Sequence, residues 1–259
     1  MTRSAMITIC GRPNVGKSTL TNALVGEKIA IVSNKPQTTR NRITAIVNRG
    51  DTQFVLMDTP GFHKPKNRLG DYMVNVVKES VADVDCVLLL VEPVASPGPQ
   101  ELALIERLGQ VGAPALLVIN KIDTVDKVRL LEVMAAYSGL YKFDAILPIS
   151  ARTGEGVEEL MEELEKYAQE GPHFFPDDAV SDQPERVIAS ELVREKMLLL
   201  LRQEIPHGIA VVIENMNERE TENGSILDVD AYIYCEKDSH KGMVIGKKGA
   251  MLKEIATLA

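Results

Sequence analysis

Short apolar runs alternate with helical patterns over the first two thirds of the chain, and this alternation limits the possible fold more than any other feature. Runs rich in apolar and β-branched residues predict strands over residues 5–10, 43–49, 53–58, 86–92, 114–120 and 145–149. Helical periodicity between these runs is typical of βαβ units, which build parallel sheets. Gly50-Asp51 separates the second and third runs and indicates a tight hairpin. The prediction is an α/β, doubly wound, mostly parallel sheet with one antiparallel strand.

A smaller α+β unit is expected after this sheet. The last helix of the first unit has an apolar face, with Gly171 expected as its C-terminal cap, and the face comprises Val157, Leu160, Met161, Leu164, Tyr167 and Ala168. Residues 173–184 are rich in proline and aspartate, so they predict a linker between a domain over residues 1–172 and a second domain over residues 185–259.

The second domain is expected to begin with a helix over residues 185–205. Its inward-facing residues are predicted to be Ile188, Leu192, Val193, Met197, Leu199 and Leu200. Strands over residues 209–215 and 226–235 should flank an acidic loop, and a further helix should begin near Ala250. Tyr232 and Tyr234 occupy one face of a strand, and we expect both in the core.

Composition excludes several classes of protein. The longest apolar run, residues 86–91, has six residues, whereas a membrane-spanning helix needs about 20. The first ten residues lack a secretory signal, so a cytoplasmic location is expected. The formal net charge of -8 argues against coating of nucleic acid by the whole surface, so any RNA site must be local.

The cysteines and histidines do not indicate a metal centre. Cys10, Cys86 and Cys235 are widely spaced and form no CxxC pair, so buried, reduced thiols are expected. The four histidines are scattered without the spacing of metal ligands. We therefore predict no transition-metal site.

A phosphate-loop pattern lies between the first predicted strand and a predicted helix. It fits GxxxxGK[ST] and consists of Gly11, Arg12, Pro13, Asn14, Val15, Gly16, Lys17 and Ser18. The glycines let backbone N–H groups face the β-phosphate at a helix N-terminus. Lys17 adds positive charge across the β- and γ-phosphates, and the Ser18 hydroxyl is expected to ligate Mg²⁺.

A second motif predicts which base the nucleotide carries. It follows the strand over residues 114–120 and consists of Asn120, Lys121, Ile122 and Asp123. The Asp123 carboxylate can accept from both N1–H and the 2-amino group of guanine, whereas adenine offers neither donor, so Asp123 favours guanine. Asn120 would support the loop and Lys121 would lie along the ring. Ser150 and Ala151 follow the next strand and are placed to offer backbone N–H groups to guanine O6.

Two loops between these motifs are predicted to sense the γ-phosphate. The first matches DxxG at a strand end and comprises Asp58, Thr59, Pro60 and Gly61. Asp58 would hold a water on Mg²⁺, and the Gly61 N–H would reach the γ-phosphate. The second loop contains Thr38 and Thr39, of which we prefer Thr39 as the Mg²⁺ ligand.

In this order, GRPNVGKS, TT, DTPG, NKID and SA resemble the translation-factor branch of the GTPases over about residues 5–170. PQTTRNR, DTPGFHKPK and the small second domain narrow the resemblance to a bacterial family of ribosome-assembly GTPases. That resemblance implies GTP hydrolysis, binding of 16S ribosomal RNA near its 3′ end, assistance to 30S subunit assembly, a monomeric state, and loose peripheral association with the inner membrane.

Phe62 follows DTPG, where the Ras-like template has a glutamine that orients the attacking water. Slow intrinsic hydrolysis is therefore expected, with the water held by backbone and metal. In relatives, the asparagine that corresponds to Asn14 can ligate a potassium ion that bridges the phosphates. The resemblance thus implies GTP or GDP and Mg²⁺ as ligands, and K⁺ as a hypothesis.

The second domain carries a basic GxxG loop. Its predicted RNA-binding residues are Lys241, Ile245, Gly246, Lys247, Lys248, Gly249 and Lys253. Residues 239–253 contain four lysines and no acid, and Ile245 and Ile255 are expected to support bases. The element order resembles a type II KH domain, whose last strand and helix would follow residue 259, so a truncated domain is expected.

Two other functions remain open from the residues alone. A nucleotide-gated RNA-binding scaffold with little hydrolysis is consistent with Phe62. A P-loop kinase or adenine nucleotidase conflicts with Asp123.

Overall fold

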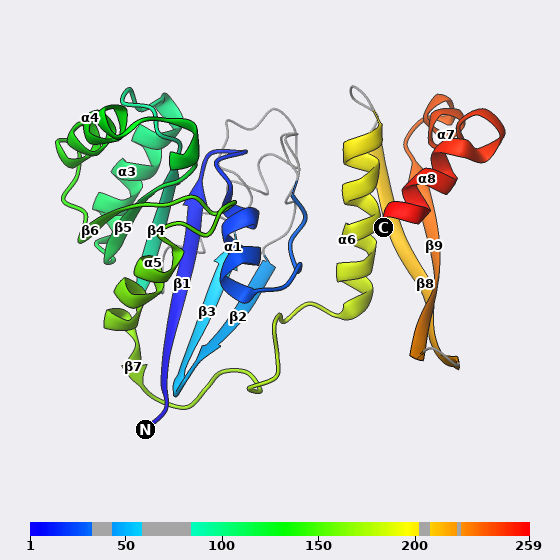
Figure 1. The fold of residues 1–259 in the computed structure, drawn as a ribbon, viewed down its shortest axis with the longest axis horizontal. Helices are drawn as coiled ribbons and strands as arrows, with labels where there is room; N and C mark the ends of the chain where they lie inside the picture. The colour runs from blue at the N-terminus through cyan, green and yellow to red at the C-terminus, as the bar shows by residue number, and fades with distance from the viewer. Residues whose placement is uncertain (33–42, 59–83, 202–207, 222–223) are drawn as a thin grey trace. The chain divides into compact units, whose positions relative to one another are not determined.

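The computed structural model describes residues 1–32, 43–58, 84–201, 208–221 and 224–259 (Figure 1). These residues form two compact units: within the described ranges, the first comprises residues 1–30 and 43–182, and the second comprises residues 31–32 and 183–259. Each unit is described by itself. Thr38, Thr39 and residues 59–62, which carry the predicted phosphate-sensing loops, lie outside the described residues.

The first unit is built on a mixed sheet with the strand order β2-β3-β1-β4-β5-β6. Its strands are β1 (Arg3–Gly11), β2 (Ile43–Arg49), β3 (Thr52–Asp58), β4 (Cys86–Val91), β5 (Ala115–Ile119) and β6 (Ala145–Pro148). All neighbouring pairs on this path are parallel except β2 and β3, which form the predicted antiparallel hairpin. All six predicted strands are confirmed, with ends that differ by at most two residues. The doubly wound fold class is therefore confirmed.

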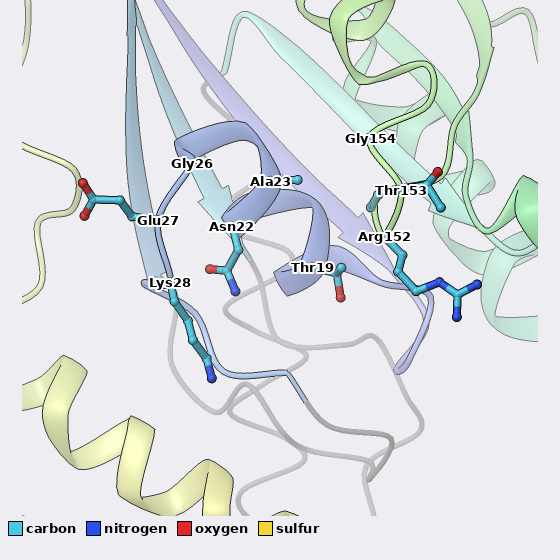
Figure 2. A pocket seen from close by; sticks show the side chains of 10 residues that line it. Thr19, Asn22, Ala23, Gly26, Glu27, Lys28, Arg152, Thr153 and Gly154 are labelled. Atoms are coloured by element: carbon cyan, nitrogen blue, oxygen red, sulfur yellow. The ribbon is translucent and has the colours of Figure 1, made fainter. Parts of the chain in front are cut away.

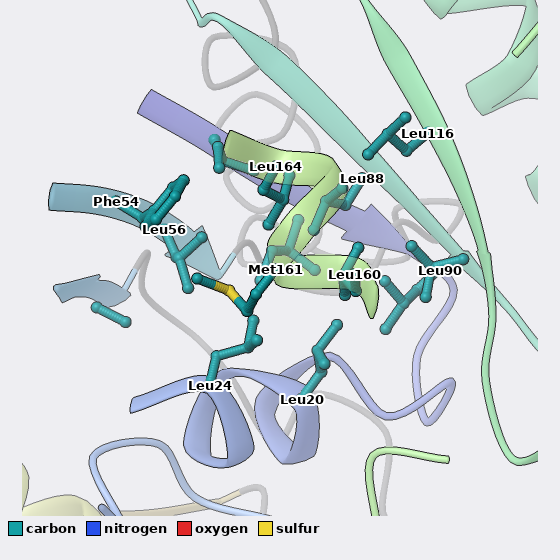
Figure 3. Close-up of a cluster of buried hydrophobic side chains, with 14 of the residues drawn as sticks. Leu20, Leu24, Phe54, Leu56, Leu88, Leu90, Leu116, Leu160, Met161 and Leu164 are labelled. Carbon is teal, nitrogen blue, oxygen red and sulfur yellow. The ribbon is translucent and has the colours of Figure 1, made fainter. Parts of the chain in front are cut away.

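Helices cover both faces of this sheet, and their bounds are α1 (Lys17–Val25), α3 (Pro99–Val111), α4 (Lys127–Ser138) and α5 (Val157–Leu164). Side chains of α1 and α5 join one buried cluster, in which Leu20, Leu88 and Leu160 are fully buried (Figure 3). Side chains of α3 and α4 join a second cluster with Leu89 and Tyr137. Strands β4 and β5 contribute to both clusters, which is why their sequences are continuously apolar.

The end of the first unit differs from the prediction. A short 3₁₀ turn, η2 (Glu165–Tyr167), follows α5, and the chain then forms β7 (Gln169–Glu170), which pairs antiparallel with the start of β1. Gly171 therefore follows a strand and does not cap a helix. The predicted apolar face is confirmed, because Leu160, Met161, Leu164 and Ala168 are buried. Strand β7 has only two residues, both polar and exposed, so no periodic pattern in the sequence predicts it.

Residues 173–182, most of the segment expected as a linker, are hydrogen-bonded to the β2–β3 hairpin. The Gln53 side chain accepts from the N–H groups of Phe174 and Phe175 at 2.8 and 2.9 Å. Its amide donates to the Phe175 carbonyl at 3.0 Å, and the Asn48 amide donates to the Asp177 carbonyl at 2.7 Å. Because Gln53 is fully buried, the segment is held by a side chain of the sheet itself.

The second unit follows the predicted order of elements, and its bounds are α6 (Glu185–Leu200), β8 (Ile209–Thr221), β9 (Gly224–Cys235), α7 (Asp238–Ile245) and α8 (Ala250–Leu258). Strands β8 and β9 form an antiparallel hairpin. Its core combines residues of α6, β8, α7 and α8 with the residue that follows α6. The buried members are Met197, Leu201, Ile209, Val244 and Ile255.

Several predictions for this unit are wrong. No acidic loop spans residues 216–225, because β8 and β9 continue on both sides of the turn and pair as far as Thr221 and Gly224. On α6, Leu199 is 58% exposed, and Leu198 is buried in its place.

Tyr232 and Tyr234 are exposed, at 52% and 57%, because they lie on the face of β9 opposite Ile233 and Cys235, which pack on the helices. Ile255, expected to support RNA bases, is buried in the core. For the two tyrosines, the alternation along the strand is confirmed, but the opposite face packs on the helices.

The three cysteines are unpaired, as expected. Cys10 and Cys86 are buried and Cys235 is partly buried. Burial raises the pKa of the Cys10 and Cys86 thiols to about 12, so both stay protonated and unreactive at neutral pH. Across the described ranges, no helix has the length and apolar character needed to cross a membrane.

Truncation of the packed face of α5 should destabilise the first unit. We expect Leu160→Ala, at a fully buried position, to lower the free energy of unfolding by about 2–5 kcal/mol, because it removes apolar contacts and leaves a cavity. The matched control is Leu131→Ala on α4, where the side chain is 66% exposed and a change within about 0.5 kcal/mol is expected. Urea unfolding followed by circular dichroism measures both. Equal destabilisation by the two substitutions contradicts the packing described here.

Candidate functional site

Polar loops gather at one edge of the first sheet. Parallel strands β1, β3, β4, β5 and β6 end at this edge, and the residues that follow them include Arg12, Glu92, Asn120 and Ser150. The carboxyl edge of an open α/β sheet is where such folds bind ligands. The phosphate-loop and base-recognition motifs, more than 100 residues apart in sequence, therefore meet in one place.

The phosphate loop has the backbone that its sequence predicts. It joins β1 to α1, which begins at Lys17, and Gly16 caps the helix with φ 100°. A Cβ atom on Gly16 would lie 2.2 Å from the Asn120 amide nitrogen, so the position requires glycine both for its backbone angle and for space. The start of α1 and its N–H groups provide a site for an anion.

The Lys17 ammonium group lies inside this loop. It donates to the carbonyl groups of Gly11 at 3.3 Å and Arg12 at 3.0 Å, and the residue is only 6% exposed. Burial lowers the pKa of Lys17, and the nearby Asp58 carboxylate opposes that shift. A buried ammonium group held by two carbonyl groups can exchange them for phosphate oxygens.

Asp58 and Ser18 form a second polar pair behind the loop. The Ser18 hydroxyl donates to Asp58 Oδ2 at 2.7 Å. Asp58 is fully buried, and burial raises its pKa to about 6 despite the charge of Lys17. Its other oxygen, Oδ1, is buried and has no hydrogen-bond partner among the described residues. A buried carboxylate oxygen without a donor, next to a hydroxyl group, fits a hard cation such as Mg²⁺.

The Asn120 side chain joins three loops. Its amide donates to the Val15 carbonyl at 2.8 Å, and its Oδ1 accepts from the N–H groups of Lys121 at 2.8 Å and Ala151 at 3.0 Å. Asn120 therefore supports the loop as predicted. The Ala151 N–H that was expected to face guanine O6 donates to Asn120, and the Ser150 N–H donates to the Glu155 carbonyl at 2.8 Å. Their contact with guanine O6 stays a prediction.

The Asp123 carboxylate lies at the open end of the site, on the 3₁₀ turn η1 (Ile122–Thr124). Its Oδ1 accepts from the Ser150 hydroxyl at 2.6 Å and its Oδ2 from the Arg152 guanidinium group at 2.5 Å. The Ser150 hydrogen bond, with help from Arg152, lowers the pKa of Asp123. The carboxylate is thus ionised at neutral pH and can accept two further hydrogen bonds.

A cavity of about 540 Å³ lies beside these loops (Figure 2). It is lined by the face of α1 that carries Thr19 and Asn22, by Lys28, and by residues 151–154. Asn22 shapes its rim by accepting from the N–H groups of Ile29 and Ala30 at 3.1 and 2.9 Å. Sequence analysis missed Asn22 and Arg152, because neither belongs to a recognisable motif.

Backbone strain is concentrated in the candidate functional loops. Among the described residues, the non-glycine residues with positive φ are Asn14, Lys121 and Lys248, at 65°, 65° and 53°. Such conformations cost about 1–3 kcal/mol each and persist where the surroundings impose them. Two of these residues lie at the sheet edge described above, and the third lies in the GxxG loop.

The GxxG loop of the second unit joins α7 to α8. Gly246 and Gly249 have φ of 70° and 80°, and a Cβ atom on Gly246 would lie 2.6 Å from that of Met251. The predicted RNA-binding lysines are all exposed, and they are Lys241, Lys247, Lys248 and Lys253. Ile245 is 39% exposed beside them. The loop therefore presents a close backbone approach and positive charge to solvent, which suits single-stranded RNA.

Comparisons with known protein families agree with both units. The family described as "50S ribosome-binding GTPase" matches residues 6–121, and the KH domain family matches residues 204–259. Relatives called GTPase Era match along almost the whole chain. That of Ruminiclostridium cellulolyticum is 49% identical over 257 residues, which cover 99% of this chain and 85% of the relative. That of Geobacter metallireducens is 50% identical, with 99% and 86% covered.

Solved structures agree as well. Era in complex with MgGDPNP and nucleotides 1506–1542 of 16S ribosomal RNA has a TM-score of 0.90 and 34% identity, with 100% of this chain and 87% of that chain covered. An Aquifex aeolicus Era variant bound to GDP·AlF4⁻ has a TM-score of 0.91 and 34% identity, with 99% and 87% covered.

Proposed function

Because the chain belongs to the GTPase Era family and is a GTP-hydrolysing enzyme, we propose that it is a molecular switch that binds 16S ribosomal RNA and assists assembly of the 30S subunit. The proposal that the chain binds a guanine nucleotide rests on one observation: Asp123, Asn120 and the phosphate loop lie together at one sheet edge. The proposal that the chain binds RNA rests on the strained, lysine-rich GxxG loop.

Guanine selection is proposed to depend on Asp123. Both carboxylate oxygens face hydrogen-bond donors, and the lowered pKa keeps them ionised, so N1–H and the 2-amino group of guanine complete the set. An adenine base would leave the carboxylate without these donors, which costs free energy of binding. The residues proposed to contact the base are Asn120, Lys121, Ile122, Asp123, Ser150 and Ala151.

Mg²⁺ is proposed to bind through the Ser18 hydroxyl, through Asp58 by way of a water, and through Thr39. Two observations support this set: the Ser18 hydroxyl pairs with Asp58, and Asp58 Oδ1 has no partner within the part of the chain that the structure describes. Bound Mg²⁺ would neutralise charge that develops on the phosphates. Lys17 would hold the β- and γ-phosphates, and the backbone of the loop that contains Gly61 would orient the attacking water, because Phe62 has no polar group.

Loss of the γ-phosphate is proposed to change the loops at residues 33–42 and 59–70 and so to alter how the GxxG loop is presented to RNA. Membership of a GTPase family favours this cycle over a scaffold without turnover. Although one matching family is described by the 50S subunit, the relatives that match the whole chain include an Era bound to 16S RNA, so we propose the 30S subunit.

The family resemblance alone supports three further proposals. They are a cytoplasmic location with loose peripheral contact to the inner membrane, a monomeric state, and a K⁺ ion ligated by Asn14. Asn14 suits the last role because its side chain offers an oxygen donor within the phosphate loop.

Replacement of Asp123 tests guanine selection. We expect Asp123→Asn to weaken GTP binding by about 10²-fold or more and to favour xanthosine triphosphate, because an amide N–H can donate to the 2-oxo group of xanthine. The control, Asp126→Asn, changes the N-cap of α4, which accepts from the Arg129 N–H at 2.8 Å outside the site. Titration with fluorescent nucleotides measures both affinities. An unchanged preference for GTP in Asp123→Asn excludes the proposed role.

Charge reversal in the GxxG loop tests RNA binding. Lys247→Glu with Lys248→Glu should weaken binding of a 16S RNA 3′-end oligonucleotide and reduce the slope of log K against log salt by about 1.4, because two phosphate contacts are lost. The control, Lys127→Glu with Lys142→Glu, changes the net charge equally on the first unit. GTP affinity should be unchanged in both variants. Equal RNA affinity in the two double variants contradicts the assignment.

Comparison of monovalent salts tests the K⁺ proposal. At equal ionic strength, GTP turnover should be faster in potassium chloride than in sodium chloride, and Asn14→Ala should abolish the difference, because the oxygen ligand is removed. Phosphate release under multiple turnover measures the rates. Equal rates of the unmodified protein in both salts would falsify the proposal.

A further inference from the structure

A series of contacts between charged side chains borders the nucleotide site, and two of its members, Glu92 and Glu101, belong to none of the motifs. Glu92 follows β4 directly, and its Oε2 accepts from the Arg12 guanidinium group at 3.1 Å. Its Oε1 accepts from the Lys121 ammonium group at 2.5 Å. One carboxylate therefore contacts both the phosphate loop and the base-recognition loop.

The cation at each end of this series also contacts a group other than Glu92. Arg12 also contacts Glu101, which is 2% exposed in the first turn of α3 and whose Oε2 accepts from the Gly98 N–H at 3.1 Å. At the other end, Lys121 donates to the Asn14 carbonyl at 2.6 Å. The order of contacts is thus Glu101, Arg12, Glu92, Lys121 and Asn14.

The last two members of the series, Lys121 and Asn14, are the described non-glycine residues of this unit with positive φ. Asn14 and Lys121 both have φ of 65°, a conformation that a non-glycine residue keeps only when its surroundings impose it. The Lys121 side chain links one strained loop to the other, and Glu92 holds that side chain in place. Without Glu92, Arg12 would keep only its contact with Glu101 and Lys121 only its bond to Asn14 in this series, and the two cations would no longer be joined.

We propose that Glu92 is a positioning residue that locks the phosphate loop to the base-recognition loop and thereby slows nucleotide release. The inference rests on the proposed guanine-nucleotide site and adds a residue to it. Glu92 does not touch the nucleotide in this proposal, because both of its oxygens are taken by cations. Glu101 acts in the same way but only through Arg12.

If Glu92 acted only through its negative charge, its removal would have the opposite effect on nucleotide binding. Removal of a carboxylate beside an anion site increases the local positive charge and should strengthen the binding of phosphates. Loss of positioning should weaken it. The sign of the change therefore separates a positioning role from a purely electrostatic one.

Glu92→Gln keeps the shape of the side chain and removes its charge. We expect release of a fluorescent GDP to be about tenfold faster, as for the loss of one hydrogen-bonded charge contact, and KM for GTP to rise while kcat changes less than about twofold. Glu92→Asp keeps the charge and should give an intermediate rate. The control, Glu132→Gln on α4, removes an exposed pair with Arg129 at 2.8 Å and should leave release unchanged.

Stopped-flow release of fluorescent GDP and steady-state phosphate release provide the measurements, with thermal unfolding of the nucleotide-free variants as a check on folding. Release from Glu92→Gln that is as slow as from Glu132→Gln, or slower, overturns the inference. A fall in kcat without a change in release overturns it too. If Glu92→Gln unfolds, release from Glu92→Asp at the rate of the unmodified protein overturns it. Failure of the unmodified protein to bind GDP would instead contradict the proposed function.

Discussion

The functional edge of the first unit depends on the three hydrogen bonds of the Asn120 side chain. They bind Val15 in the phosphate loop, Lys121 in the base-recognition loop and Ala151 after β6, so segments from three parts of the chain share one buried amide. A buried amide that lost one of these partners would leave an unsatisfied polar group, which costs more than the bond contributes when it is made. The loops are thus positioned together or not at all, and the requirement for glycine at position 16 follows from the space that this amide occupies.

Among the described residues, unfavourable backbone angles occur in loops and not in the core strands. Strands β4 and β5 are continuously apolar, whereas the described non-glycine residues with positive φ lie in the loops proposed to bind nucleotide and RNA. Two buried charges also lie beside one of these loops. Lys17 and Asp58 are buried beside the phosphate loop, where each shifts the pKa of the other toward its charged form, against the effect of burial. The favourable free energy of core packing offsets the cost of the strained backbone and of the buried charges.

The second unit shows where reasoning from sequence reached its limit. The order of its elements and the GxxG loop were predicted, because glycines and lysines mark that loop directly. The position of Tyr232 and Tyr234 was not predicted, because alternation in a strand reveals that two faces differ but not which face meets the helices. The long pairing of β8 and β9 was also missed, since polar residues in an exposed hairpin form no apolar pattern.

The sequence by itself determined the alternation of strands and helices, the α/β fold class, and the residues of the phosphate, base-recognition and GxxG motifs. These follow from local rules, namely side-chain periodicity, glycine backbone freedom and fixed motif spacing. Only the tertiary structure decided that the Asn120 side chain joins Val15 to Ala151, that Arg152 faces Asp123, and that Glu92 joins Arg12 to Lys121. Those contacts join residues 29 to 105 positions apart, and strand order rather than local sequence brings them together.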